Sequence, residues 1–135
     1  MNIAGNSTSS SLLPMLDSHV RAAPESAYIG TETVRLTALD KACAGWITAS
    51  DRIFLKIDVQ GVECQVLQGA KQTLPQIIGI QVELSLVPLY EDQVLYDVLW
   101  DTLVRNGFEL WNIFPGLTER CSGRLLQFDG VLCKT

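Results

Sequence analysis

Apolar residues divide most of the chain into alternating strands and helices. Nearly continuous apolar stretches at residues 53–59 and 77–86 are typical of buried strands covered on both faces. Between them, apolar residues recur at helical spacing, and Pro75 ends the pattern. The sequence therefore predicts a helix whose inward face is formed by Val62, Val66, Leu67, Ala70 and Leu74.

The rest of the chain extends this alternation. Residues 34–39 alternate as a short strand, and Asp40 lies where the N-cap of a following helix is expected. A helix after Pro88 would end at Gly107 and turn Val94, Leu95, Val98, Leu99 and Leu103 inward. Strands at 108–114 and 124–133 would follow, with a turn at Pro115–Gly116. The order predicts one α/β domain: an irregular N-terminal segment, residues 1–33, and an α/β core, residues 34–135.

Composition excludes several classes of protein. With 135 residues, 47% of them hydrophobic, the chain can bury a real core. The net charge is −5, so the chain lacks the excess of basic residues that binding a nucleic acid needs, and we expect no nucleic-acid partner. The longest apolar run, residues 77–89, is too short to span a bilayer and contains Glu83, so we expect no membrane partner.

The cysteines point to a reducing compartment. There is no CxxC pair, and His19 is the one histidine, so a zinc site has poor spacing support and we expect no metal. His19 has no partner near it in sequence and is expected on the surface or in a loop. We expect a soluble, cytoplasmic protein with structural, reduced thiols at Cys43, Cys64, Cys121 and Cys133.

Two carboxylates stand near the ends of the buried strands. Right-handed crossovers would bring the carboxyl ends of these strands side by side, with Asp58 and Glu83 near them. Ligands of open α/β sheets bind at that edge. Asp58 is either a cap for the next helix or a site carboxylate that orients a nucleophile or takes its proton. Glu83 must be paired, protonated or open to a cleft, because a lone buried carboxylate is costly.

Three neighbours of Asp58 have a structural and a functional interpretation. Gly61 permits a positive φ and a close backbone approach, as glycines at strand–helix turns commonly do. Glu63 lies in the first helical turn, where the helix dipole favours an acid. Lys56 points to the same face as Asp58 and is expected to neutralise a neighbouring charge.

Several segments together resemble a known family. They are "NSTSSSLLPM", "VRLTALD", "LKIDVQGVECQVLQGA", "VELSLVPLY", "GFELW" and "GRLLQFDGVL". Their order and spacing, from about Asn6 to the end, are similar to the C-terminal portion of FkbM-type methyltransferases. The segment around Asp58 is the most specific of them.

The resemblance implies a Rossmann-like class I methyltransferase sheet with an antiparallel C-terminal edge. It implies methyl transfer from S-adenosylmethionine to a hydroxyl oxygen on a sugar or other natural product. Asp58 and Glu83 would be the catalytic residues, and Asp58, Gly61 and Glu63 would contact the donor. Asp58 would either polarise the acceptor hydroxyl or hold the methionyl end of the donor.

The sequence departs from the family pattern in one respect, which bears on whether this chain binds the donor. The glycine-rich first strand and loop of the family, and the acids after its second and third strands, would precede Met1. We therefore expect a partial domain, a fragment that lacks the first strands of its sheet and binds the donor weakly or not at all. The surface left open would favour self-association. The alternative is a non-catalytic α/β module that oligomerises or binds a protein partner.

Overall fold

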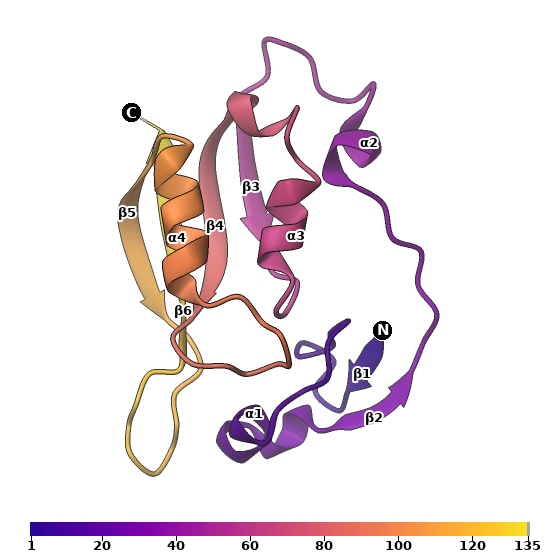
Figure 1. The fold of residues 1–135 in the computed structure, drawn as a ribbon, viewed down its shortest axis with the longest axis vertical. Helices are drawn as coiled ribbons and strands as arrows, with labels where there is room; N and C mark the ends of the chain where they lie inside the picture. Colours follow the sequence, from indigo (N-terminus) through magenta and orange to yellow (C-terminus); the bar gives the residue numbers. More distant parts are fainter. Residues whose placement is uncertain (135) are drawn as a thin grey trace.

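The computed structural model describes residues 1–134 and centres on a four-stranded sheet (Figure 1). The strand order is β3-β4-β6-β5, formed by β3 (Ile53–Ile57), β4 (Ile77–Ser85), β6 (Gln127–Lys134) and β5 (Phe108–Pro115). β3 and β4 are parallel, whereas β6 is antiparallel to both β4 and β5. The sheet is thus mixed, with the antiparallel C-terminal edge that the family resemblance implied.

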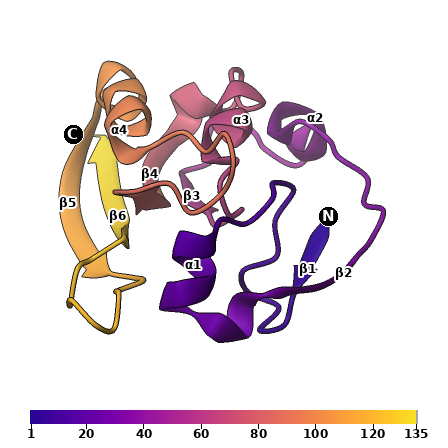
Figure 2. The same ribbon diagram turned by 60° about the horizontal axis from the view of Figure 1, so that its bottom comes forward.

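Two helices cover one face of this sheet. α3 (Glu63–Gln68) connects β3 to β4, and α4 (Tyr96–Arg105) precedes β5; Figures 1 and 2 show both on the same side. Their apolar residues pack on alternate residues of β4, which bury the core by the two-residue repeat of a strand. The centre of this core consists of Leu67, Ile80, Val82, Leu84, Leu99 and Leu103.

An N-terminal unit lies below the carboxyl ends of β3 and β4 (Figures 1 and 2). It holds more regular structure than the irregular segment expected for residues 1–33: β1 (Asn2–Ala4) pairs with β2 (Tyr28–Thr31), and α1 (Asp17–Ala22) and the 3₁₀ turn η1 (Pro24–Ser26) lie between them. The amide of Leu16 donates to the carbonyl of Leu89 at 2.9 Å, which fixes the unit to the loop after β4.

The expectation of a surface histidine was wrong. His19 is 3% exposed, and its ring meets the edge of Tyr90 with the ring centres 5.2 Å apart. Burial lowers the pKa of His19. Tyr90 lies 71 residues further along the chain, so no local pattern reveals this contact.

The predicted strand at residues 34–39 was also wrong. The segment is extended but pairs with no strand among the described residues, and it is mostly exposed. A short helix, α2 (Leu39–Cys43), starts before Asp40, which is therefore not an N-cap. The carboxylate of Asp40 instead accepts hydrogen bonds from the amides of Gln72 and Thr73, tying α2 to the segment after α3.

β3 and the first helix differ from their predictions in extent. β3 ends the sheet, and Phe54 and Lys56 are exposed, so this strand is not covered on both faces. α3 ends at Gln68, and residues up to the 3₁₀ turn η2 (Leu74–Gln76) form turns. The expected long helix is thus only two turns, because the chain must return to start β4.

The elements after β4 confirm the predicted order, but their bounds and faces differ. α4 begins at Tyr96, so Val94 and Leu95 precede the helix, and the last strand begins at Gln127 rather than at residue 124. Val98 of α4 is 54% exposed rather than inward. The Pro115–Gly116 turn is part of a longer loop, residues 116–126, closed by a bridge between Thr118 and Leu125. None of the helices in residues 1–134 is long and apolar enough to span a membrane.

Candidate functional site

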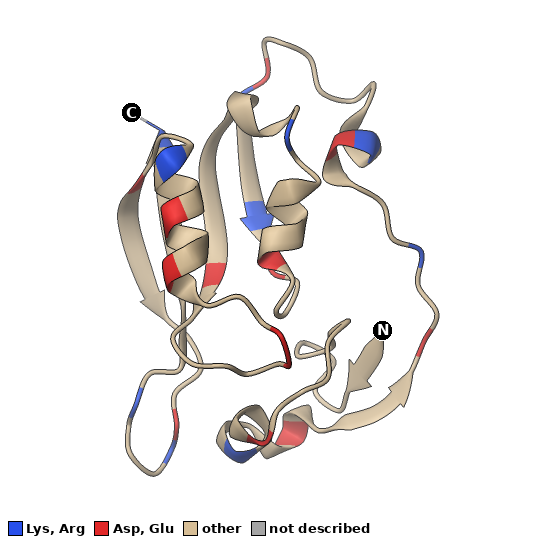
Figure 3. Ribbon diagram, viewed as in Figure 1, with Lys and Arg blue, Asp and Glu red and all other residues tan. Residues whose placement is uncertain are grey.

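The parallel pairing of β3 and β4 brings Asp58 and Glu83 to one edge. Ile57 pairs with Val82, so the two carboxylates come next on neighbouring strands. The expectation that the two strand ends lie side by side is confirmed. Figure 3 shows acidic residues at the lower ends of both strands.

Gln60 joins the two carboxylates. Its side-chain Nε2 donates to Asp58 Oδ1 at 3.2 Å and to Glu83 Oε2 at 2.7 Å, and its Oε1 accepts from the Tyr90 hydroxyl at 2.7 Å. Its backbone carbonyl accepts from the Ser11 hydroxyl at 2.5 Å. With a φ of 55°, Gln60 turns its side chain back between the strands, and it is 8% exposed. One amide therefore holds both acids at fixed positions.

Glu83 lies in a half-buried, acidic environment. Oε2 accepts a second hydrogen bond, from Gln127 Nε2 at 2.9 Å. Asp129 is its cross-strand neighbour on β6. Burial, and then the nearby charges of Asp58 and Asp129, raise the pKa of Glu83 to about 8. With this pKa, the Glu83 carboxyl is mostly protonated at pH 7. It loses its proton, and can then act as a base, as the pH rises through about 8.

Asp58 has different surroundings. Its Oδ2 lies 3.0 Å from Lys56 Nζ in an exposed ion pair, which confirms the expected neutralising role of Lys56. The capping interpretation of Asp58 was wrong, because the N-cap of α3 is Val62 and no side chain caps it. Both carboxylate oxygens of Asp58 thus have a partner, Oδ2 in Lys56 and Oδ1 in Gln60, and a contact between Asp58 and a ligand stays a prediction.

Gly61 and Glu63 form the turn beneath these acids. Gly61 has a φ of 99°, and a Cβ there would lie 3.1 Å from Leu13 and 3.2 Å from Tyr90. Its amide donates to Glu63 Oε1 at 2.9 Å, and burial raises the pKa of Glu63. Both residues are thus packed against protein. Direct donor contact by either one stays a prediction, and their visible role is to hold the turn that presents Gln60.

An apolar groove of about 820 Å³ runs along the free edge of β3. Consecutive residues 55–59 form one wall, α3 forms another, and the extended segment 34–39 lies opposite. Lys56 and Asp58 are its charged residues, while Glu83, Gly61 and Glu63 do not line it. The apolar side chains of the walls include Leu36, Leu39, Leu55, Ile57, Val62 and Val66. The volume suits a small-molecule ligand.

Sequence reasoning missed the neutral members of the cluster. No periodic pattern marks Gln60, Tyr90 or Gln127. Gln60 and Gln127 lie 23 and 44 residues from Glu83 in the sequence, and Tyr90 lies 30 residues from Gln60. The one available signal was indirect: a carboxylate in an apolar strand, such as Glu83, requires buried donors.

The fold and site define an α/β domain with an acidic sheet edge beside an apolar groove. The family comparison is specific: the model of the methyltransferase FkbM domain matches residues 1–110. The chain therefore belongs to the FkbM methyltransferase family. Searches of curated proteins and of solved structures gave no match.

Proposed function

We propose that the chain is the methyl-transferring part of an S-adenosylmethionine-dependent enzyme that methylates a hydroxyl oxygen on a sugar or other natural product. The observation that carries this proposal is the family match, because residues 1–110 include the groove, Asp58, Gln60 and Glu83. The parallel β3–α3–β4 unit followed by antiparallel strands supports a Rossmann-like arrangement.

The groove fits such a donor in size, polarity and charge. S-adenosylmethionine supplies a methyl group on a positively charged sulfur and also carries an amino group, a carboxylate and an adenosine. Apolar side chains such as Leu39 and Val66 suit the adenosine, and the Asp58 carboxylate suits the amino group.

The two acids take different tasks in this proposal. Asp58 lines the groove and holds the positive methionyl end of the donor. Glu83 takes the proton of the acceptor hydroxyl at the strand edge, because a pKa of about 8 places it near the pH at which a general base is effective. Gln60 fixes the spacing between the two, and such positioning supplies much of the rate in a transfer reaction.

Binding by the isolated chain should be weak. Within the described residues, the groove offers the donor one carboxylate and apolar walls, and one face of it is the unpaired edge of β3. We expect a dissociation constant of roughly 0.1 to 1 mM, which corresponds to about −5 kcal/mol. Submicromolar affinity would contradict this expectation.

Calorimetric titration with S-adenosylhomocysteine, which keeps the methionyl amino group, tests the proposal. We expect weak saturable binding that Asp58→Asn removes. The matched control is Asp101→Asn, which breaks an exposed ion pair of similar length, 2.9 Å, on α4 and should leave binding unchanged. Absence of heat from the folded chain at millimolar ligand, or equal loss in both variants, would contradict donor binding in this groove.

A second candidate is a non-catalytic module that binds a protein partner through the open edge of β3. Phe54 on that edge is 55% exposed, as expected for a surface that another chain covers. If no donor binds and Phe54→Lys abolishes association with another polypeptide, this second function holds instead.

A further inference from the structure

The opposite edge of the sheet has an unusual strand, β5. β5 is an edge strand of the sheet and pairs with β6 alone among the described residues. Its outer edge therefore presents backbone groups that no strand pairs with. Seven of its eight residues are exposed, and Phe108 is the buried one. The family match ends at residue 110, so most of this strand lies beyond it.

The exposed residues of β5 are mostly large and apolar. Leu110 is 38% exposed, Trp111 65%, Ile113 46% and Phe114 49%. Natural edge strands are normally protected by charges, by prolines or by being short. β5 has one charged residue, Glu109, and its proline comes last; Figure 3 shows the strand with a single acidic band. A bulge between Leu110 and Asn112 interrupts the ladder, but it leaves an aromatic side chain exposed.

We propose that β5 is the interface of a homodimer, in which β5 of a second copy of this chain adds to it antiparallel and continues the sheet. The interface would be isologous, so each apolar residue of the strand meets the same apolar strand across a two-fold axis. The inference stands independently of the proposed methyltransferase function.

The charges around β5 favour a second copy in this orientation. Antiparallel pairing brings the start of each strand to the end of the other. Glu109, near the start, then lies beside the loop that follows β5 in the second copy. That loop carries two exposed arginines, Arg120 and Arg124, and one acid, Glu119. Its net charge is therefore opposite to that of Glu109 at both ends of the interface. Arg120 also lies 3.9 Å from Glu25 of its own chain, which leaves Arg124 as the arginine of this loop without an ion pair among the described residues.

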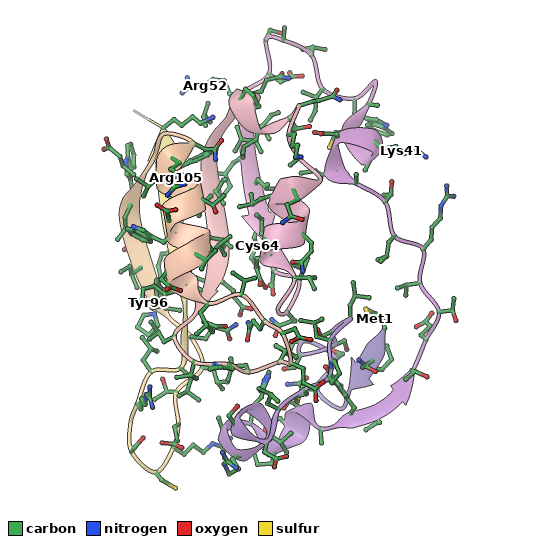
Figure 4. All side chains as sticks on the ribbon, in the orientation of Figure 1. Met1, Lys41, Arg52, Cys64, Tyr96 and Arg105 are labelled. Atoms are coloured by element: carbon green, nitrogen blue, oxygen red, sulfur yellow. The ribbon has the colours of Figure 1, made fainter. Side chains whose placement is uncertain are left out.

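The helix layer extends the same surface. α4 packs beside β5 on one face of the sheet, and Tyr96, Val98 and Val104 of α4 are 41%, 54% and 48% exposed. Figure 4 labels Tyr96 and Arg105 at the two ends of this helix. Apolar side chains of a second α4 would cover them. The helix therefore adds exposed apolar side chains beside the sheet edge, although Tyr96 and Val98 point to different sides of α4.

Sedimentation equilibrium of the full chain over about 1 to 500 µM tests the proposal, because dimers respond to concentration. We expect the mass to rise toward twice 14.9 kDa. Ile113→Lys should raise the dissociation constant at least tenfold, since it buries a charge at the centre of the strand. The matched control is Phe54→Lys, which should leave the dimer intact. It places the same charge on the other edge strand, β3, at a residue that is 55% exposed against 46% for Ile113.

Backbone amides give a second measurement that does not depend on a variant folding. In the unmodified chain, hydrogen exchange of residues 109–114 should slow as concentration rises, while residues 53–57 of β3 keep their rates. A monomer at every concentration overturns the proposal. So does a dimer that Phe54→Lys dissociates and Ile113→Lys does not, or one in which protection appears on β3 alone.

Discussion

Asp58 and Glu83 follow neighbouring parallel strands, yet the two carboxylates have opposite surroundings. Asp58 comes after β3, the end of the sheet, and forms an exposed ion pair with Lys56 beside the groove. Glu83 belongs to β4, which lies between β3 and β6, and its bonds come from the neutral amides of Gln60 and Gln127.

The difference shows how position in a sheet sets the chemistry of an acid. An interior strand removes water from Glu83 and places Asp129 directly across from it, so the pKa rises to about 8. An edge strand leaves the Asp58 side chain 45% exposed, beside Lys56. One sheet edge thus provides a group suited to bind charge and a group suited to accept a proton, joined by one amide.

Gln60→Leu should have the largest effect on stability, because it removes the side-chain amide that donates to both Asp58 and Glu83. The substitution leaves the buried Tyr90 hydroxyl and Glu83 without a principal partner, which costs roughly 2–4 kcal/mol of unfolding free energy. Urea unfolding measures the loss. Gln65→Leu on the exposed side of α3 is the control and should change stability by no more than about 0.5 kcal/mol. Equal effects of the two variants would mean that the network contributes nothing.

Glu83→Gln should change how stability depends on pH. The folded-state pKa, about 8, exceeds the ordinary value of 4.5, so the folded chain holds a proton that the unfolded chain loses between these values. Stability therefore falls as pH rises from 4.5 through 8, and Glu83→Gln should remove that part of the fall.

The size of this effect is limited by exposure. Because Glu83 is only half-buried, solvent screening reduces the difference to roughly 1–2 kcal/mol between pH 5 and pH 9. Unfolding midpoints of both proteins across that range give the measurement. Parallel curves would show that Glu83 titrates as an ordinary surface acid.

Elements with strong periodicity could be predicted from the sequence. β4 is a nine-residue strand rich in apolar residues, and α4 repeats Leu99 and Leu103 at helical spacing, so both elements could be located. The side-by-side placement of Asp58 and Glu83 also followed, on the condition that the two strands are neighbours, because a right-handed crossover then brings their carboxyl ends to one edge.

What failed depended on contacts between distant segments. Residues 34–39 alternate as a strand would, but alternation cannot supply the neighbouring strand that hydrogen bonding requires. Gln60 looks like an ordinary turn residue until Tyr90 and Glu83, 30 and 23 residues away, are placed around it. Polar networks of this kind are specified by three-dimensional position and leave no period in the sequence.

Lys56→Met should have the smallest effect on stability. It tests the exposed member of the comparison, Asp58, by removing its ion-pair partner. The Lys56–Asp58 pair is close, 3.0 Å, but the side chains are 56% and 45% exposed, so water and salt screen their attraction. A double-mutant cycle of Lys56→Met and Asp58→Asn, followed by urea unfolding at 0.15 M salt, should give a coupling energy within experimental error. Donor binding should survive in Lys56→Met, because Asp58 keeps its charge and its bond to Gln60. A coupling comparable to the loss in Gln60→Leu would show that Asp58 is as poorly solvated as Glu83 and remove the distinction between the two acids.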